Sequence, residues 1–234
     1  MTESRTITDA QPAVHERLAD VVAKHLNSPY LKPIQEHNQL AFAQFKQWLA
    51  CEQTPQNPKK LWLDSCCGTG FSAVQIAEAN PDVLVVGIDQ SLKRLSKEAD
   101  YLQRAPKNCL FLRTNCEDFW RLCVAENIYF NKHTIFYPNP YPKPAQLTKR
   151  WHGHPVFPVL KTLSENIEVR SNWQIYIEEF ANAWSQLTAQ HLTVSELIVE
   201  NPATLFEKKY AASGQRLWGT ASDSFFEPLG VVTG

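Results

Sequence analysis

Glycine is scarce in this sequence, with only eight in 234 residues. Three of them, Gly68, Gly70 and Gly87, lie within twenty positions of one another. Glycine is needed where the backbone turns tightly or approaches a ligand, so this cluster after an apolar run indicates a ligand-binding loop. The order is an apolar run at 61–63, Asp64, a small-residue loop, a helix start, a second apolar run and Asp89. This order predicts a site for a nucleoside cofactor.

Long apolar runs and paired cysteine motifs are also missing. No run approaches the ~18 residues of a membrane span, and residues 1–6 do not resemble the start of a secretory signal. The six cysteines include no C-x-x-C, and the sequence His152-Gly153-His154 has no neighbouring acid or thiol. We therefore expect a cytoplasmic protein with reduced thiols, no membrane contact and no metal.

Acidic residues are absent between Glu126 and Glu165. The same segment carries five cations, whereas the whole chain has a net charge of −1, so the remainder is net negative. The cations are Lys132, Lys143, Lys149, Arg150 and Lys161. Such a segment predicts a localised anion-binding face, although chance alone also produces acid-free windows.

Apolar periodicity predicts alternating strands and helices. Residues 38–51 place Phe42, Phe45 and Trp48 on one helical face. Strands are expected at 61–64, 83–88, 109–113, 133–138, near 166–170, at 193–199 and near 216–221. Helices are expected at 71–79, 91–104, 116–125, near 156–163 and at 173–188, with a loop at 201–215. This alternation predicts an α/β, Rossmann-like fold, with a mostly parallel seven-stranded sheet and helices on both faces. We expect a single domain, in which a tail and amphipathic helix (1–50) pack on the main body (51–234).

Four polar residues follow predicted strands: Asp64, Asp89, Asn115 and Asn139. Parallel sheets bind ligands beyond the carboxyl ends of their strands. The fold should therefore bring all four residues to one rim.

Two cofactors fit the glycine loop. The segment Gly68-Thr69-Gly70-Phe71-Ser72-Ala73 matches the G-x-G-x-x-G/A dinucleotide pattern. S-adenosylmethionine is favoured because Asp64 would repel a pyrophosphate but can hold an ammonium group. The segment resembles motifs I and II of class I methyltransferases, with Cys66 at the first glycine of the pattern. The expected cofactor-binding residues are Asp64, Cys66, Gly68, Gly70, Asp89 and Asn115.

A proline-rich segment follows the predicted strand 133–138. Residues 136–144 read Phe-Tyr-Pro-Asn-Pro-Tyr-Pro-Lys-Pro, a stiff loop that fixes Asn139 at the sheet edge. Here the chain resembles the tRNA (guanine-N7)-methyltransferase family, whose motif is F-P-D-P-W-P. Ser171-Asn172-Trp173 with Tyr176 resembles the family's T-D-W-x-x-Y, and residues 204–207 resemble its T-x-F-E. The resemblance covers about residues 60–220.

The chain departs from the family by having amides at acidic positions. Asn139 replaces an aspartate, Asn172 replaces a guanine-contacting aspartate, and Asn115 replaces an acid after the third strand. The resemblance implies catalytic roles for Asn139 and Glu207. It implies substrate contacts for Lys143, Lys149, Arg150, Asn172, Thr204 and Glu207. The alternatives are a solvated charge at Glu207, a helix cap at Thr204, and core packing rather than base stacking for Trp173 and Tyr176.

The resemblance implies an S-adenosylmethionine-dependent methyltransferase that modifies guanine N7 in tRNA, as a monomer or homodimer. One alternative is a methyltransferase for another RNA or a small molecule. A second is a catalytically weak relative that binds cofactor and RNA.

Overall fold

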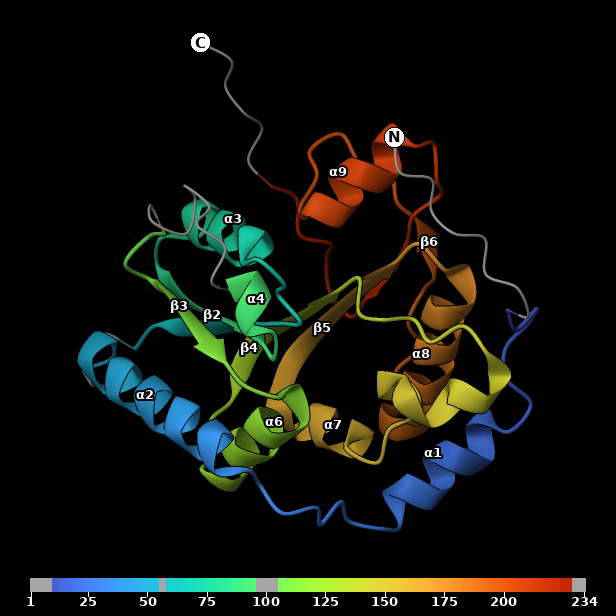
Figure 1. The fold of residues 1–234 in the computed structure, drawn as a ribbon, viewed down its shortest axis with the longest axis horizontal. Helices are drawn as coiled ribbons and strands as arrows, with labels where there is room; N and C mark the ends of the chain where they lie inside the picture. The colour runs from blue at the N-terminus through green and yellow to red at the C-terminus, as the bar shows by residue number, and fades with distance from the viewer. Residues whose placement is uncertain (1–9, 55–57, 96–104, 229–234) are drawn as a thin grey trace.

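The computed structural model describes residues 10–54, 58–95 and 105–228, which form a seven-stranded sheet covered by helices on both faces (Figure 1). The strand order is β3-β2-β1-β4-β5-β7-β6. Strands β1 to β5 pair in parallel, and β7 runs antiparallel to β5 and β6. The strands are β1 Lys60–Ser65, β2 Val83–Asp89, β3 Cys109–Arg113, β4 Phe130–Phe136, β5 Ser164–Ser171, β6 Ser195–Glu196 and β7 Trp218–Ala221. The predicted fold class is confirmed.

Alternating side chains along the strands build two apolar layers. Leu63 and Val86 are neighbours in the β1–β2 register. Their side chains point to the face of the sheet on which most of the helices pack. Trp62 and Val85 face the other side, where helix α3 (Phe71–Ala79) packs. The helices of the first layer are α1 Leu18–Leu26, α2 Glu36–Glu52, α6 Cys116–Ala125, α7 Leu160–Leu163 and α8 Gln174–Thr188.

The N-terminal helices pack on this core. Helix α1 lies against α8, and α2 lies against α6 and β3. Phe42 and Phe45 of α2 are buried against Phe119, as the amphipathic pattern predicts. Buried Asn38 donates to Asp118 and accepts from Thr114, which ties α2 to the end of β3. No helix among the described residues is both long and apolar enough to cross a membrane.

Four predicted segments differ from the structure. The strand expected at 193–199 is only two residues long, β6 Ser195–Glu196. The loop expected at 201–215 is wrong, because it contains α9 (Leu205–Ala212). The segment before this helix contacts α3, since the Gln75 side chain donates to the Pro202 carbonyl at 3.2 Å. The helix expected near 156–163 is a short 3-10 turn, Phe157–Val159, followed by α7. Of the helix expected at 91–104, the structure has α4 (Leu92–Leu95), and residues 96–104 lie outside the described part of the chain.

Candidate functional site

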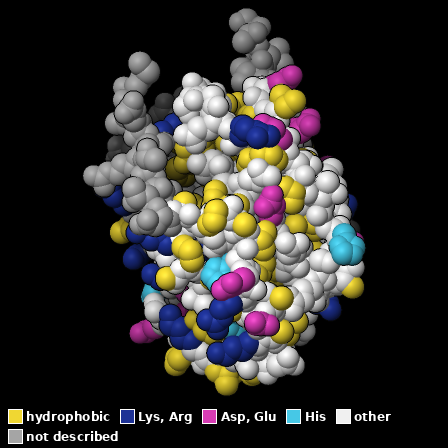
Figure 2. Space-filling model, turned by 90° about the vertical axis from the view of Figure 1, so that its right-hand side faces the viewer, with side chains coloured by type: hydrophobic (Ala, Val, Ile, Leu, Met, Phe, Trp, Pro, Cys, Tyr) yellow, Lys and Arg dark blue, Asp and Glu magenta, His cyan; other side chains and the backbone are white. Residues whose placement is uncertain are grey.

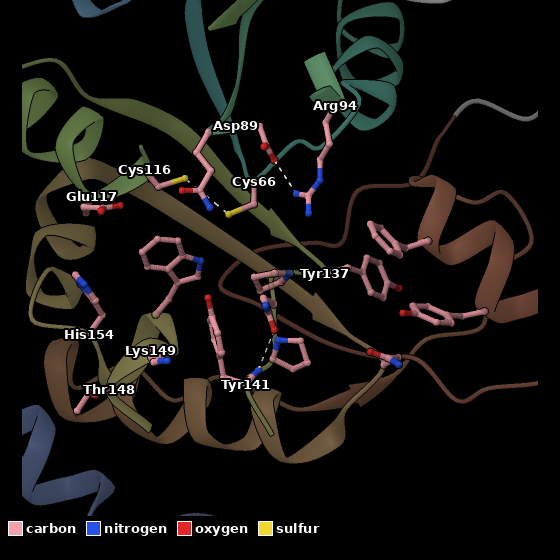
Figure 3. Close-up of a pocket in the computed structure, with 18 of the residues that line it drawn as sticks. Cys66, Asp89, Arg94, Cys116, Glu117, Tyr137, Tyr141, Thr148, Lys149 and His154 are labelled. Atoms are coloured by element: carbon pink, nitrogen blue, oxygen red, sulfur yellow. Dashed lines mark hydrogen bonds and ion pairs between the residues drawn. The ribbon is translucent and has the colours of Figure 1, made fainter. Parts of the chain in front are cut away.

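A cavity of about 1000 Å³ opens at the carboxyl ends of the parallel strands (Figure 3). Each parallel strand contributes a lining residue at or just after its end. These residues are Cys66, Asp89, Cys116, Tyr137 and Asn172. The predicted convergence at one rim is therefore present for Asp89 and Asn139, which both line the cavity.

The loop between β1 and α3 takes left-handed backbone conformations at three positions. Gly68 has a φ of 63° and Gly70, the N-cap of α3, a φ of 84°. Cys66 has a φ of 60°, a conformation that costs a non-glycine residue about 1–2 kcal/mol. Its sulfur lies 3.7 Å from that of Cys116, and both residues line the cavity. The turn survives the loss of the first glycine, at the cost of local strain.

Asp89 is the acid that faces the cavity next to this loop. Its carboxylate accepts the backbone N–H of Gly68 at 3.0 Å and that of Ser91 at 2.8 Å. Arg94 from α4 reaches the same carboxylate at 3.3 Å, and its side chain is half exposed. Two backbone amides thus fix an acceptor at the cavity wall, with Arg94 as its half-exposed ionic partner.

Asp64 lies behind the cavity wall. Its carboxylate is fully buried and accepts hydroxyl hydrogen bonds from Ser72 at 2.5 Å and Thr134 at 3.0 Å. Burial raises the pKa of Asp64 to about 7. The structure therefore does not support the prediction that Asp64 contacts the cofactor ammonium. Asp64 instead fixes α3 against β1 and β4.

Asn115 also lies outside the cavity lining. It is the N-cap of α6, and its backbone N–H donates to the Asn38 side chain at 3.0 Å. The next two residues, Cys116 and Glu117, line the cavity instead. The turn after β3 therefore does reach the cavity, but through Cys116 and Glu117 and not through Asn115.

The proline-rich loop projects Asn139 into the cavity. Asn139 is exposed, and its side-chain oxygen accepts the backbone N–H of Tyr141 at 3.3 Å. Arg150 holds this loop from the protein interior, because its buried guanidinium donates to the backbone carbonyls of Tyr141 and Lys143, both at 3.1 Å. The loop is therefore shaped by a buried cation as well as by its prolines.

This role overturns the prediction that Arg150 contacts phosphate. Arg150 is fully buried, pairs with Glu179 at 2.5 Å and lies over the Trp173 ring. Glu179 also accepts from His152. Lys132 is buried against Glu168 at 3.4 Å. Three of the five cations in the acid-free segment stay exposed: Lys143, Lys149 and Lys161.

Glu207 and Thr204 both hold α9 in place. Thr204 is the N-cap of α9, where its hydroxyl accepts the Glu207 N–H at 3.0 Å. Glu207 is fully buried and accepts from Arg170 at 2.8 Å and from the Tyr137 hydroxyl at 3.0 Å. The structure therefore does not support direct substrate contacts by either residue, and the helix-cap alternative for Thr204 is confirmed.

The predicted residue Asn172 lines the cavity, where its side-chain amide donates to that of Gln215 at 3.2 Å. Two other lining residues were not singled out from the sequence. Phe206 and Tyr210 line the cavity from α9, and their spacing of four residues was the available signal. Tyr176, by contrast, is buried in the core and Trp173 is packed against it, as the core-packing alternative proposes.

The face of the molecule that carries α8 and α9 is not uniformly basic over its described residues. Figure 2 shows Lys and Arg side chains gathered mainly toward the lower end of this face, with acidic side chains among them. The cations that line the cavity among the described residues are Arg94 and Lys149. Within the described ranges, no cluster of three His, Cys, Asp or Glu side chains has the arrangement of a metal site.

The family model Methyltransf_4, described as "Putative methyltransferase", matches residues 58–220. No curated protein matches the chain significantly. Among solved structures, the 16S rRNA methyltransferase KamB is 16% identical with a TM-score of 0.55, over 82% of this chain and 94% of that one. An antibiotic-related methyltransferase is 13% identical with a TM-score of 0.54, over 77% and 93%.

A third structure is a variant of the 16S rRNA (adenine(1408)-N(1))-methyltransferase from Catenulisporales acidiphilia with cosubstrate SAM. It is 14% identical with a TM-score of 0.51, over 79% of this chain and 93% of that one. At such low identity these likenesses show the fold alone. They agree with the Rossmann-like architecture derived above.

The cavity fits S-adenosylmethionine, the cofactor of this family. Of the predicted cofactor-binding residues, Cys66 and Asp89 line the cavity, whereas Gly68 and Gly70 shape the loop without being part of the lining. Nothing lies within 4 Å of the position that a Cβ of Gly68 would take. The matched segment spans most of the chain and includes all three motifs identified in the sequence. The chain belongs to the Methyltransf_4 family, and is an S-adenosylmethionine-dependent class I methyltransferase similar to the tRNA (guanine-N7)-methyltransferases.

Proposed function

We propose that this protein transfers a methyl group to N7 of guanine in tRNA. The observation that carries this proposal is the neutral character of the cavity on the side of α9. Its lining there consists of Asn139, Asn172, Gln215 and the rings of Tyr137, Phe206 and Tyr210. None of these six side chains is a carboxylate or an imidazole that could remove a proton, and the acids and the histidine of the lining, Asp89, Glu117 and His154, lie elsewhere on the cavity wall (Figure 3).

A ring nitrogen with a free lone pair requires no such base. When bound, S-adenosylmethionine supplies a methyl group on a sulfonium centre, which a lone pair attacks directly. Guanine N7 carries no proton, so the contribution of the protein is alignment and exclusion of water. The amides and rings of the cavity are suited to both tasks.

In this proposal Asp89 accepts from the cofactor ribose, and the backbone of the 66–70 loop contacts the rest of the cofactor. Asn139 and Asn172 hydrogen-bond the edge of the base, as neutral replacements for the family's acids. Lys143 and Lys149, both exposed beside the cavity, contact RNA phosphates. Glu207 orients Tyr137 and α9 from behind the wall.

A second candidate is methylation of adenine N1, which also offers a lone pair. The observation in its favour is the loss of exposed acids, because a carboxylate suits the N1–H and N2–H₂ edge of guanine. Amide oxygens and nitrogens can instead pair with the adjacent amino group of adenine. A cofactor- and RNA-binding relative with little activity is the third reading.

The test is nucleoside mass spectrometry of tRNA from cells with and without the gene, and from deleted cells complemented with wild type or Asp89→Ala. We expect 7-methylguanosine to fall on deletion and to return only with the wild type. A fall in 1-methyladenosine instead would establish the second candidate. No change in any methylated nucleoside would contradict both.

A further inference from the structure

Helix α9 presents an exposed aromatic surface inside the cavity. Phe206 and Tyr210 are one helical turn apart, with ring centroids 6.0 Å apart and planes inclined by 25°. Tyr137, at the end of β4, places its ring 6.4 Å from that of Phe206, inclined by 26°. Phe206 is 45% exposed although it lines the cavity. A large ring that faces an open cavity offers a flat binding surface.

The protein holds this surface rigidly from behind. The Tyr137 hydroxyl donates to the Glu207 carboxylate, which is fully buried and paired with Arg170. Thr204 caps the first turn of α9. The open face of Phe206 therefore belongs to an aromatic cluster in which Tyr137 is anchored to the buried Arg170–Glu207 pair.

Hydrogen-bonding groups lie beside the rings. The backbone N–H of Gln215 donates to the Tyr210 carbonyl at 3.1 Å, which places Gln215 next to the end of α9. The Gln215 side chain accepts from Asn172, and both side chains line the cavity. Amides that can donate and accept, next to flat rings, match the edge and the face of a nucleobase.

Cations flank the aromatic cluster. Lys208 and Lys209 are exposed on α9, and the Lys209 ammonium lies 5.9 Å from the Tyr210 ring centroid. Lys149 lies at the far side of the same cavity, across from Tyr137 (Figure 3). Aromatic rings with cations on both sides fit a base within a phosphate-bearing strand. They fit a small uncharged substrate less well.

We propose that Phe206 and Tyr210 form a stacking platform for the target base of the RNA substrate, with Asn172 and Gln215 at the base edge. This inference rests on the proposed function, because it names the group that holds the methylated base. It assigns to α9 a specificity role that its buried residues, Thr204 and Glu207, do not have. The base is held by its face on α9 while its edge is read by amides.

The test compares Phe206→Leu with Leu205→Ala. Leu205 is the adjacent exposed apolar residue of α9 and does not line the cavity, so it serves as the matched control. The four nucleoside 5′-monophosphates and ribose 5-phosphate are titrated in the presence of S-adenosylhomocysteine. Cofactor affinity is measured separately for every variant.

We expect at least one nucleotide to bind wild type at least about fivefold more tightly than ribose 5-phosphate does, since base–aromatic stacking is worth that much or more. Phe206→Leu should remove this difference and raise KM for RNA, with cofactor affinity unchanged. Leu205→Ala should retain both. Equal binding of nucleotides and ribose 5-phosphate to wild type, or an unchanged preference in Phe206→Leu, would overturn the platform.

The stacking platform and the proposed guanine-N7 activity can fail independently of each other. If the preference depends on Phe206 but the nucleoside formed is not 7-methylguanosine, the platform stands and the guanine-N7 proposal fails. If 7-methylguanosine forms at wild-type efficiency in Phe206→Leu, the platform fails and the proposed function stands.

Discussion

Arg170 and Glu207 form a buried ion pair that joins β5 to α9, with a guanidinium nitrogen 2.8 Å from a carboxylate oxygen. Arg170 also pairs with Glu168 on its own strand. Glu207 accepts in addition from the Tyr137 hydroxyl, and burial, followed by the negative charge of Glu207, raises the pKa of Tyr137 above its usual range. One carboxylate therefore fixes both the helix and the ring that border the cavity.

Glu207→Gln should destabilise the protein by about 3 kcal/mol, because it removes one of the two carboxylates that pair with the buried Arg170 guanidinium. Denaturant unfolding measures this loss. The control is Glu196→Gln, whose partner Arg216 is exposed, and which should cost less than about 1 kcal/mol. If Glu207→Gln unfolds like wild type yet methylates at least about tenfold more slowly, Glu207 contacts the substrate directly and our placement of it is wrong.

Replacing both Lys143 and Lys149 by alanine should make tRNA binding less dependent on salt. Each lost phosphate contact lowers the slope of log affinity against log salt by about 0.7–0.9. Arg150→Ala should act differently, by lowering the free energy of unfolding by about 3–5 kcal/mol, because Glu179 loses its buried partner. An unchanged salt slope in the double variant, with folding intact, would place the RNA contacts elsewhere.

Stability should depend on pH through Asp64. Its pKa in the folded protein is raised to about 7, whereas the unfolded value is about 3.9. The folded state therefore binds this proton more tightly, and the Asp64 contribution to stability is lost as pH rises from about 4 to 7. Unfolding measured across this window should show that decline in wild type relative to Asp64→Asn. Parallel pH curves for the two proteins would show that the Asp64 carboxyl is not perturbed.

Asn172→Asp and Asn139→Asp should keep or increase guanine methylation, by up to about tenfold, because a carboxylate accepts more strongly from the guanine edge. Gln215 can rotate its amide to donate to an aspartate at position 172. The ratio of kcat/KM on guanine- and adenine-containing RNA measures the effect. A loss of guanine activity in both variants would favour the adenine alternative.

The sequence predicted the β1–α3–β2 unit well, because Leu61, Leu63 and the run 83–88 are apolar strands that end at acids. It missed α9 because the residue that faces the core there is a glutamate. The buried Glu207 carboxylate is paired with Arg170, 37 positions earlier, while Phe206 faces the cavity. This helix thus buries a charged residue and exposes apolar ones, the reverse of an ordinary amphipathic helix.

Arg150 was misassigned for the same physical reason. An arginine in an acid-free segment is normally a surface cation, and its partner Glu179 lies outside that segment on α8. Asp64 shows the reverse case, since an acid at a strand end was expected to face the ligand but is closed off by Ser72 and Thr134. Whether a polar residue is exposed depends on its pairing with residues of distant segments. The local sequence pattern holds no information on such pairings.

The most direct test uses purified protein, unmodified tRNA transcripts and S-adenosylmethionine with an isotopically labelled methyl group. After digestion, the labelled nucleosides are identified by mass spectrometry, with Asp89→Ala as the cofactor-site control. Our account predicts labelled 7-methylguanosine, lowered roughly ten- to a hundredfold in Asp89→Ala at limiting cofactor, because the ribose loses a charged acceptor. Label in another nucleoside, or none in tRNA while S-adenosylmethionine still binds, would contradict it.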